Sequence, residues 1–119
     1  MVIKKKDPYR FFKIEAKELL VQLNQWFLEL EDNPKDKTIL NQLFRAAHTM
    51  KGAARLVGLK NIGELAHLME DLLGEAKTGI HPITSNQLDR CLQSLDTIER
   101  VLQAINTGED PHIDVSATI

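Results

Sequence analysis

Apolar residues recur at alternating steps of three and four through four separate segments of the chain, and this spacing restricts the fold more than any other feature. Such steps keep one stripe of a helix facing a core, whereas a half-buried strand requires apolar and polar residues to alternate. The spacing therefore predicts helices over residues 8–32, 35–57, 62–78 and 85–106, and no strands.

Residues that start helices stand before each segment. Asp, Asn and Thr side chains cap helices, proline is tolerated in a first turn, and Glu or Gln three residues after the cap completes a capping box. The candidate caps are Asp7-Pro8, Asn33-Pro34 with Asp36, Asn61 with Glu64, and Thr84 with Gln87. These signals support the four predicted helix starts.

The connections between the segments are short, and short connections make neighbouring helices run in opposite directions. We therefore expect an all-α fold, an antiparallel up-down-up-down four-helix bundle within residues 1–107. A polar stretch without a helical stripe follows, so residues 108–119 are expected to form a disordered linker or tail.

Length and charge exclude several classes of function. A chain of 119 residues has room for one domain. Its 15 Lys and Arg against 17 Asp and Glu give a net charge of −2, which provides no overall attraction for nucleic acid or an anionic membrane.

The single cysteine, Cys91, cannot form an internal disulfide and fits a small core position. No segment resembles a signal peptide or a membrane span, so we expect a domain in the cytoplasm. We also expect the domain to be monomeric.

His48 is a residue that the core pattern does not explain. It lies in the string FRAAHTMKGAARLVG, about 130° around the helix from the apolar stripe, so its ring is expected to reach solvent. Lys51 and Arg55 are predicted beside it, and Gly52 follows one turn later. A glycine inside a helix costs about 1 kcal/mol relative to alanine. Either access to the His48 ring or a close helix crossing explains that cost.

The predicted helix over 62–78 carries His67 and Glu70 three residues apart, with Glu70 nearer the core. If this helix lies antiparallel beside the helix of His48, Glu70 can accept a hydrogen bond from Nδ1–H and leave Nε2 outward with its lone pair. An imidazole oriented in this way is a nucleophile suited to phosphoryl transfer. Lys51 could then place an ammonium against the phosphate oxygens. The chain has no phosphate-binding loop for ATP, so we expect no bound cofactor and a phosphoryl group supplied by another domain or protein.

The string HTMKGAARLVG, in which HxxKG is followed by a second glycine, resembles the signature of histidine phosphotransfer (HPt) domains. Together with HLMEDLL, it is similar to the amino-terminal HPt domain of CheA-type chemotaxis histidine kinases, over roughly residues 8–106. The resemblance implies a two-component phosphorelay in which the kinase's separate ATP-binding domain phosphorylates His48 on Nε2. The phosphoryl group then passes to an aspartate of a response-regulator receiver domain. The resemblance also implies that Glu70 bonds His48, that Lys51 and His67 assist, and that Gly52 gives access.

On this interpretation the chain is a phosphoryl carrier and not an enzyme by itself. It is expected to be either a free-standing HPt protein or, as the tail favours, part of a larger CheA-like kinase. Arg55 departs from the family, whose members usually carry a small residue there, and it is a candidate for selecting the partner. Leu56 and Phe44 are candidate docking contacts beside Gly52 and the histidine, although an exposed leucine is common.

Alternative functions use the same residues. His48, His67 and Glu70 could bind a metal ion, but Lys51 disfavours a dication and a second Glu-x-x-His is missing, so no metal is expected. The histidine face could instead dock a partner helix without any chemistry. The two remaining histidines lie in a turn and in the tail, without a carboxylate at helical spacing to orient them.

Overall fold

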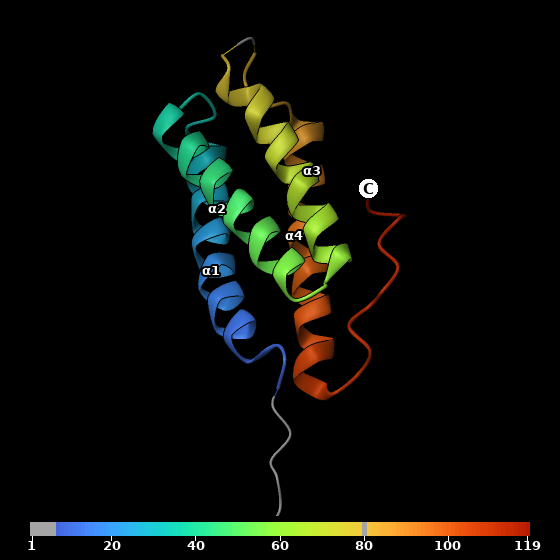
Figure 1. Ribbon diagram of the computed structural model, residues 1–119. Helices are drawn as coiled ribbons and strands as arrows, with labels where there is room; N and C mark the ends of the chain where they lie inside the picture. Colours follow the sequence, from blue (N-terminus) through green and yellow to red (C-terminus); the bar gives the residue numbers. More distant parts are fainter. Residues whose placement is uncertain (1–6, 80) are drawn as a thin grey trace, which may run out of the picture.

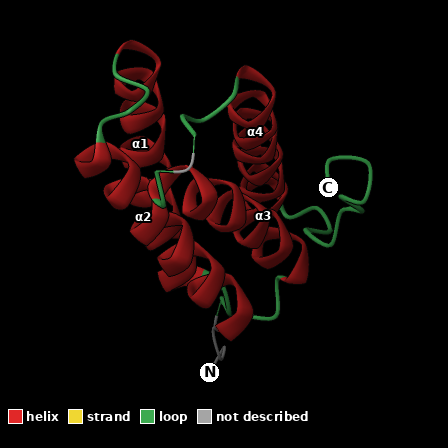
Figure 2. Cartoon of the chain, turned by 90° about the horizontal axis from the view of Figure 1, so that it is seen from above, coloured by secondary structure: helices red, strands yellow, loops and turns green. Residues whose placement is uncertain are grey.

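The computed structural model describes residues 7–79 and 81–119, and the regular elements of this part are four helices (Figure 1). Their bounds are α1 Arg10–Asp32, α2 Lys37–Leu56, α3 Lys60–Lys77 and α4 Ser85–Thr107. Each helix packs against the next, and α1 also packs against α4, which closes the bundle (Figure 2). The predicted all-α four-helix bundle is confirmed, and each helix begins and ends within two residues of the predicted bounds.

Two of the predicted caps start helices as expected. Asp36 caps α2, because its carboxylate accepts hydrogen bonds from the backbone N–H groups of Thr38 at 2.9 Å and Ile39 at 3.1 Å. Thr84 and Gln87 form the predicted capping box at the start of α4, with reciprocal bonds of 3.1 Å and 3.0 Å. These bonds satisfy backbone donors that a helix start leaves without partners.

The other two predicted caps are wrong. Asp7 accepts a bond from the backbone of Tyr9 and pairs with Lys13 at 2.6 Å, and α1 starts without a side-chain cap. Asn61 lies inside the first turn of α3, which begins at Lys60, so Asn61 cannot stand before it. The reason is that α3 begins directly after the preceding turn. The side chain of Asn61 instead donates hydrogen bonds to the segment after Gly108, which is distant in sequence.

The core is formed by apolar side chains from every helix. The largest fully buried ones are Phe27, Leu23, Leu30, Leu40, Leu43, Met50, Leu59, Ile62, Leu65, Met69, Leu73 and Leu95. Cys91 is also fully buried, and this burial raises the pKa of its thiol to about 12. The predicted core role of Cys91 is thus confirmed. No helix in the described part of the chain is long and apolar enough to cross a membrane.

The segment after Gly108 differs from the expected disordered tail. It folds back over the bundle (Figure 1), and the side-chain amide of Asn61 donates hydrogen bonds to the backbone oxygens of Pro111 at 2.7 Å and Ile113 at 3.1 Å. Val115 is buried in the core, with 4% of its surface exposed. Two contacts therefore hold this mostly polar segment on the bundle. One is the burial of Val115, and the other is the pair of hydrogen bonds from Asn61, which lies 50 residues before Pro111 in the sequence.

We predict that Asn61→Asp destabilises the fold by about 1–3 kcal/mol, since it replaces the amide donor with an oxygen that faces two carbonyl oxygens. The carboxylate keeps the oxygen that accepts a bond from the backbone N–H of Ile62, so only the donor is lost. Urea unfolding of the variant measures the change. In a chain shortened to residues 1–108 the same substitution should cost much less, and an equal cost there would contradict the anchoring role.

Candidate functional site

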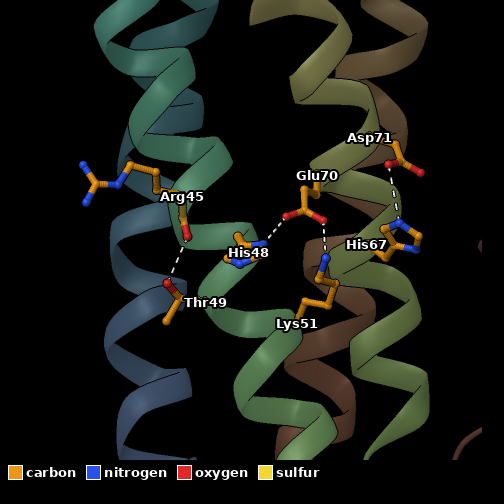
Figure 3. A network of polar contacts seen from close by, with 7 residues as sticks. All are labelled: Arg45, His48, Thr49, Lys51, His67, Glu70 and Asp71. Atoms are coloured by element: carbon orange, nitrogen blue, oxygen red, sulfur yellow. Dashed lines mark hydrogen bonds and ion pairs between the residues drawn. The ribbon is translucent and has the colours of Figure 1, made fainter.

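His48 lies on the outer face of α2, where the helical wheel placed it. Its neighbours Ala47 and Met50 are fully buried, whereas 65% of the His48 side chain is exposed. The apolar side of α2 is held in the bundle, and the ring is consequently presented to solvent near α3 (Figure 3).

Glu70 of α3 contacts two residues of α2 with its two carboxylate oxygens. Oε2 accepts a hydrogen bond from Nδ1 of His48, and Oε1 accepts one from Nζ of Lys51 at 2.6 Å (Figure 3). An ionised carboxylate only accepts hydrogen bonds, so Nδ1 carries the hydrogen in this arrangement. In the neutral ring the lone pair is then on Nε2. The geometry predicted for these two residues is present.

The pKa of Glu70 is shifted by opposing causes. Burial raises it, because only 8% of the residue is exposed, but the bonds from Lys51 and His48 lower it more. The net result is a pKa below the ordinary value of 4.5. Glu70 therefore remains an anion, and an acceptor for His48, at neutral pH.

Lys51 does not stand free beside His48. Its ammonium bonds Glu70, and only 16% of its side chain is exposed. The predicted contact of Lys51 with phosphate would have to use one of the two N–H groups of the ammonium that Glu70 does not occupy. In the structure the bond from Lys51 lowers the pKa of Glu70, the same carboxylate that contacts His48.

His67 is not joined to this network. Its Nε2 lies 3.5 Å from Oδ1 of Asp71, its neighbour one turn along α3, and half of its side chain is exposed. Figure 3 shows it on the other side of Glu70 from His48. Within residues 7–79 and 81–119, no group of three His, Cys, Asp or Glu side chains could hold a metal ion. The alternative of a metal site is therefore not favoured.

A hollow beside the ring of His48 contains residues that the sequence analysis missed. It is lined by Phe44, Arg45, His48, Thr49, Glu70, Asp71 and Gly74. Arg45 and Asp71 are the charged residues that join His48 and Glu70 in this hollow. Their places in the sequence, three residues before His48 and one residue after Glu70, could have indicated that they lie near the site. They were missed because neither belongs to the motif.

Phe44 is a wall of the hollow. A Cβ atom added to Gly74 would lie 3.4 Å from the Phe44 ring, so the absence of a side chain there lets the ring pack against α3. Nζ of Lys77 lies 4.6 Å from the centre of the same ring, a cation–π contact. Phe44 is thus partly buried, with its ring held against α3 at the edge of the hollow. Its role as a docking contact stays a prediction.

The glycine after the histidine leaves open space. A Cβ atom built on Gly52 would meet no atom within 4 Å, so no close helix crossing requires it and that explanation is wrong. The close approach occurs instead at Gly63, where an added Cβ would lie 3.3 Å from Cγ of Arg55. Arg55 therefore lies across α3, while Leu56, the next residue, is 89% exposed.

Replacing Glu70 with Gln tests the network through the pH dependence of stability. Because folding depresses the pKa of Glu70, its carboxylate stabilises the fold above the unfolded-state pKa near 4.5. That contribution is lost as the pH falls through the lower folded-state pKa. We expect Glu70→Gln to lower the free energy of unfolding by about 1–3 kcal/mol at pH 7, with the difference closing in acid.

Urea unfolding between about pH 7 and pH 3 measures this difference. Glu64→Gln is the matched control, since it makes the same change at an exposed position of α3 and should leave the stability nearly unchanged. A difference between wild type and Glu70→Gln that stays constant over this range would show that the charge of Glu70 does not stabilise the fold.

The chain is similar in sequence to known proteins. Residues 9–107 match the family described as the Hpt domain. The chemotaxis protein CheA of Halobacterium salinarum is 38% identical over 113 residues, which are 95% of this chain and 17% of that protein. The sensor histidine kinase CheAY of Helicobacter pylori is 43% identical over 100 residues, which are 83% of this chain and 12% of that protein. The chain thus spans less than a fifth of the length of these relatives.

Solved structures show the same likeness. The CheA phosphotransferase domain from Thermotoga maritima matches with a TM-score of 0.80 at 38% identity, covering 87% of this chain and 99% of that one. A solution structure of the histidine phosphotransfer domain of CheA matches with a TM-score of 0.82 at 35% identity, covering 91% of this chain and 83% of that one. The chain therefore belongs to the Hpt domain family, and its relatives in that family are CheA proteins.

Proposed function

We propose that His48 carries the phosphoryl group and that Nε2 is the atom that accepts it. The observation that supports this most directly is the hydrogen bond between Nδ1 of His48 and Glu70 on a ring that is largely exposed. The bond occupies one ring nitrogen and leaves the lone pair on the other. An exposed nucleophile with a fixed tautomer is what transfer between two protein partners requires.

In the first transfer, the lone pair of Nε2 attacks the γ-phosphorus of ATP held by a separate kinase domain. The Nε2–P bond forms, the bond from phosphorus to the bridging oxygen breaks, and ADP leaves. Nδ1 keeps its hydrogen, so the phosphorylated ring carries a positive charge. The carboxylate of Glu70, which is bonded to that hydrogen, offsets this charge.

In the second transfer, a carboxylate oxygen of a receiver aspartate attacks the phosphorus. The Nε2–P bond breaks, and its electron pair returns to Nε2. Glu70 again keeps the ring in the tautomer that accepts this pair, and Lys51 keeps Glu70 ionised through both steps. We assign Lys51 this positioning role. The assisting role expected for His67 stays a prediction, since its contact is with Asp71.

The partners follow from this chemistry. One is the ATP-binding domain of a histidine kinase, and the other is the receiver domain of a response regulator. Relatives of this chain are named as chemotaxis proteins and are far longer, so we propose that the ATP-binding part lies in a separate domain of such a kinase. A phosphorelay of this kind operates in the cytoplasm, where we place the protein, and it requires no cofactor bound to the chain itself.

The phosphorylation site is tested by His48→Gln. The variant should fold with unchanged helical circular dichroism, because the ring is exposed and contributes little to the core. It should accept no phosphoryl group when incubated with ATP and a catalytic domain of a chemotaxis-type kinase. Intact mass, together with the loss of the added phosphate in acid and its retention in base, identifies phosphohistidine on the wild type.

His81→Gln and His112→Gln are the matched controls, and both should be labelled like the wild type. Residual acid-labile phosphate on His48→Gln would place the acceptor elsewhere. A folded wild-type chain that several competent kinases fail to label would instead favour a bundle that only docks a partner.

The orienting role of Glu70 is tested by Glu70→Ala. A hydrogen bond to a charged group contributes about 1.5–3 kcal/mol, so its loss in the transition state should slow phosphorylation about ten- to hundredfold. The nucleophile remains, and labelling should therefore reach completion slowly. Initial rates at saturating kinase domain measure the effect, with a thermal unfolding scan to show that the variant is folded at the assay temperature.

Glu64→Ala provides the control on the same helix and should be phosphorylated at the wild-type rate, because this carboxylate is exposed and lies outside the network. An unchanged rate for Glu70→Ala would remove Glu70 from the mechanism while leaving His48 as the acceptor.

A further inference from the structure

Arg45 is an exposed cation of α2, and no acidic side chain in the described part of the chain forms an ion pair with it. It precedes His48 by three residues, and side chains at this spacing on a helix are neighbours, with Cβ atoms about 5–6 Å apart. Both residues line the same hollow. A guanidinium without a carboxylate partner, one turn from the reactive ring, has its N–H donors available for another anion.

Arg45 and Lys51 lie on opposite sides of His48. On a helix, the positions three before and three after a residue lie about 60° to either side of it. Lys51 is on the side of α3, where its ammonium bonds Glu70 (Figure 3). Arg45 is on the side of α1, and its guanidinium is directed away from α3 (Figure 3). The other residues that line the hollow between α1 and α2 with Arg45 are uncharged, so no carboxylate among them competes for the guanidinium.

The two nitrogens of the His48 ring face different sides of α2. Nδ1 is directed at Glu70 of α3. Nε2 lies across the five-membered ring from Nδ1, so it points away from Glu70. A phosphoryl group on Nε2 is therefore carried away from α3 and out over α2, on the side of Arg45. Of the two cations that flank the ring, Arg45 is thus the one placed to meet the phosphoryl group.

The charges around the hollow also favour this contact. Among the lining residues Glu70 and Asp71 are the acidic ones, and Arg45 is the only one with a permanent positive charge. Lys51 offsets the charge of Glu70, whereas Asp71 has His67 as its neighbour, at 3.5 Å. A phosphoryl group on a side chain adds a charge of about −1.5 to −2 at pH 7. Its arrival leaves an excess of negative charge beside the hollow, which Arg45 can offset.

We propose that Arg45 binds the phosphoryl group of phosphorylated His48, with its guanidinium donating hydrogen bonds to the phosphoryl oxygens. This inference rests on the proposed function of His48. The N–H groups of a guanidinium form a planar fork that matches two oxygens of a phosphate, and such charged hydrogen bonds are stronger than neutral ones. Because the Arg45 side chain is exposed, it can turn toward the phosphoryl group without moving a helix. Arg45 thus contacts the phosphoryl group, whereas Lys51 bonds the carboxylate that contacts the ring.

The test uses phosphoramidate, a small donor that transfers its phosphoryl group to a histidine nitrogen as ammonia leaves, so no partner protein is needed. Phosphorus NMR then follows the phosphoryl group on His48, identified as the signal that is absent from His48→Gln. A nearby cation favours the doubly charged form of this group and lowers its pKa. Arg45→Gln should therefore raise the pKa of the phosphoryl group by about 0.2–0.7, as expected for the loss of an ion pair at an exposed site.

Two further variants serve as controls. Arg45→Lys keeps the positive charge and should recover most of the lower pKa of the phosphoryl group. Arg55→Gln makes the same change as Arg45→Gln on the same helix, but about 10.5 Å along the axis from His48. This separation exceeds the Debye length of about 8 Å at physiological ionic strength, so the pKa of the phosphoryl group should stay at the wild-type value. Circular dichroism shows whether each variant is folded.

An unchanged pKa of the phosphoryl group in Arg45→Gln, on a folded and labelled chain, overturns the proposal and leaves His48 as the acceptor. A rise in Lys51→Gln without a rise in Arg45→Gln overturns it as well, and would place the phosphoryl group on the side of α3. A folded wild-type chain that phosphoramidate does not label on His48 would contradict the proposed function together with this inference. The failure of Arg45 alone is therefore distinguishable from the failure of His48.

Discussion

The carboxylate of Glu70 joins two helices through two different partners, and the character of the site depends on this bridge. One oxygen orients the His48 ring, and the other holds the ammonium of Lys51. Either bond alone would leave part of a nearly buried anion without a partner, which is costly. With both bonds formed, the anion is stable at neutral pH and α2 is held in one register against α3. The same bonds therefore join the two helices and fix the tautomer of the His48 ring.

The surroundings of the bridge show how a small bundle combines close packing with an open reactive face. Glycines at two points of α3 accept side chains from α2, namely Arg55 at Gly63 and Phe44 at Gly74. These contacts bring the helices together above and below the network. The glycine on α2 has the opposite effect, because nothing occupies the space beside Gly52. The helices are close where side chains cross between them and leave open space beside Gly52, one turn after His48.

The parts of this structure that sequence predicts well are those that a single helix determines. The apolar stripes predicted the four helices, and the angle of His48 from its stripe predicted an exposed ring. Contacts that depend on the distance between elements were harder to predict. The long side chain of Lys51 can turn toward solvent or toward α3, and only the separation of α2 and α3 decides between them. The bond of Asn61 to the segment after Gly108 is of the same kind, since its partners lie far along the chain.

The burial of Cys91 has a practical consequence for following the motions of the bundle. A thiol reagent reacts with the thiolate, and a pKa of about 12 combined with complete burial leaves almost none available in the closed bundle. Reaction at this cysteine therefore requires the helices around it to separate. The labelling rate of Cys91 therefore reports how often the helices separate, just as amide hydrogen exchange reports how often backbone hydrogen bonds open. Conversely, a cysteine introduced on the surface can be labelled alone, so a probe can be attached without first removing the native thiol.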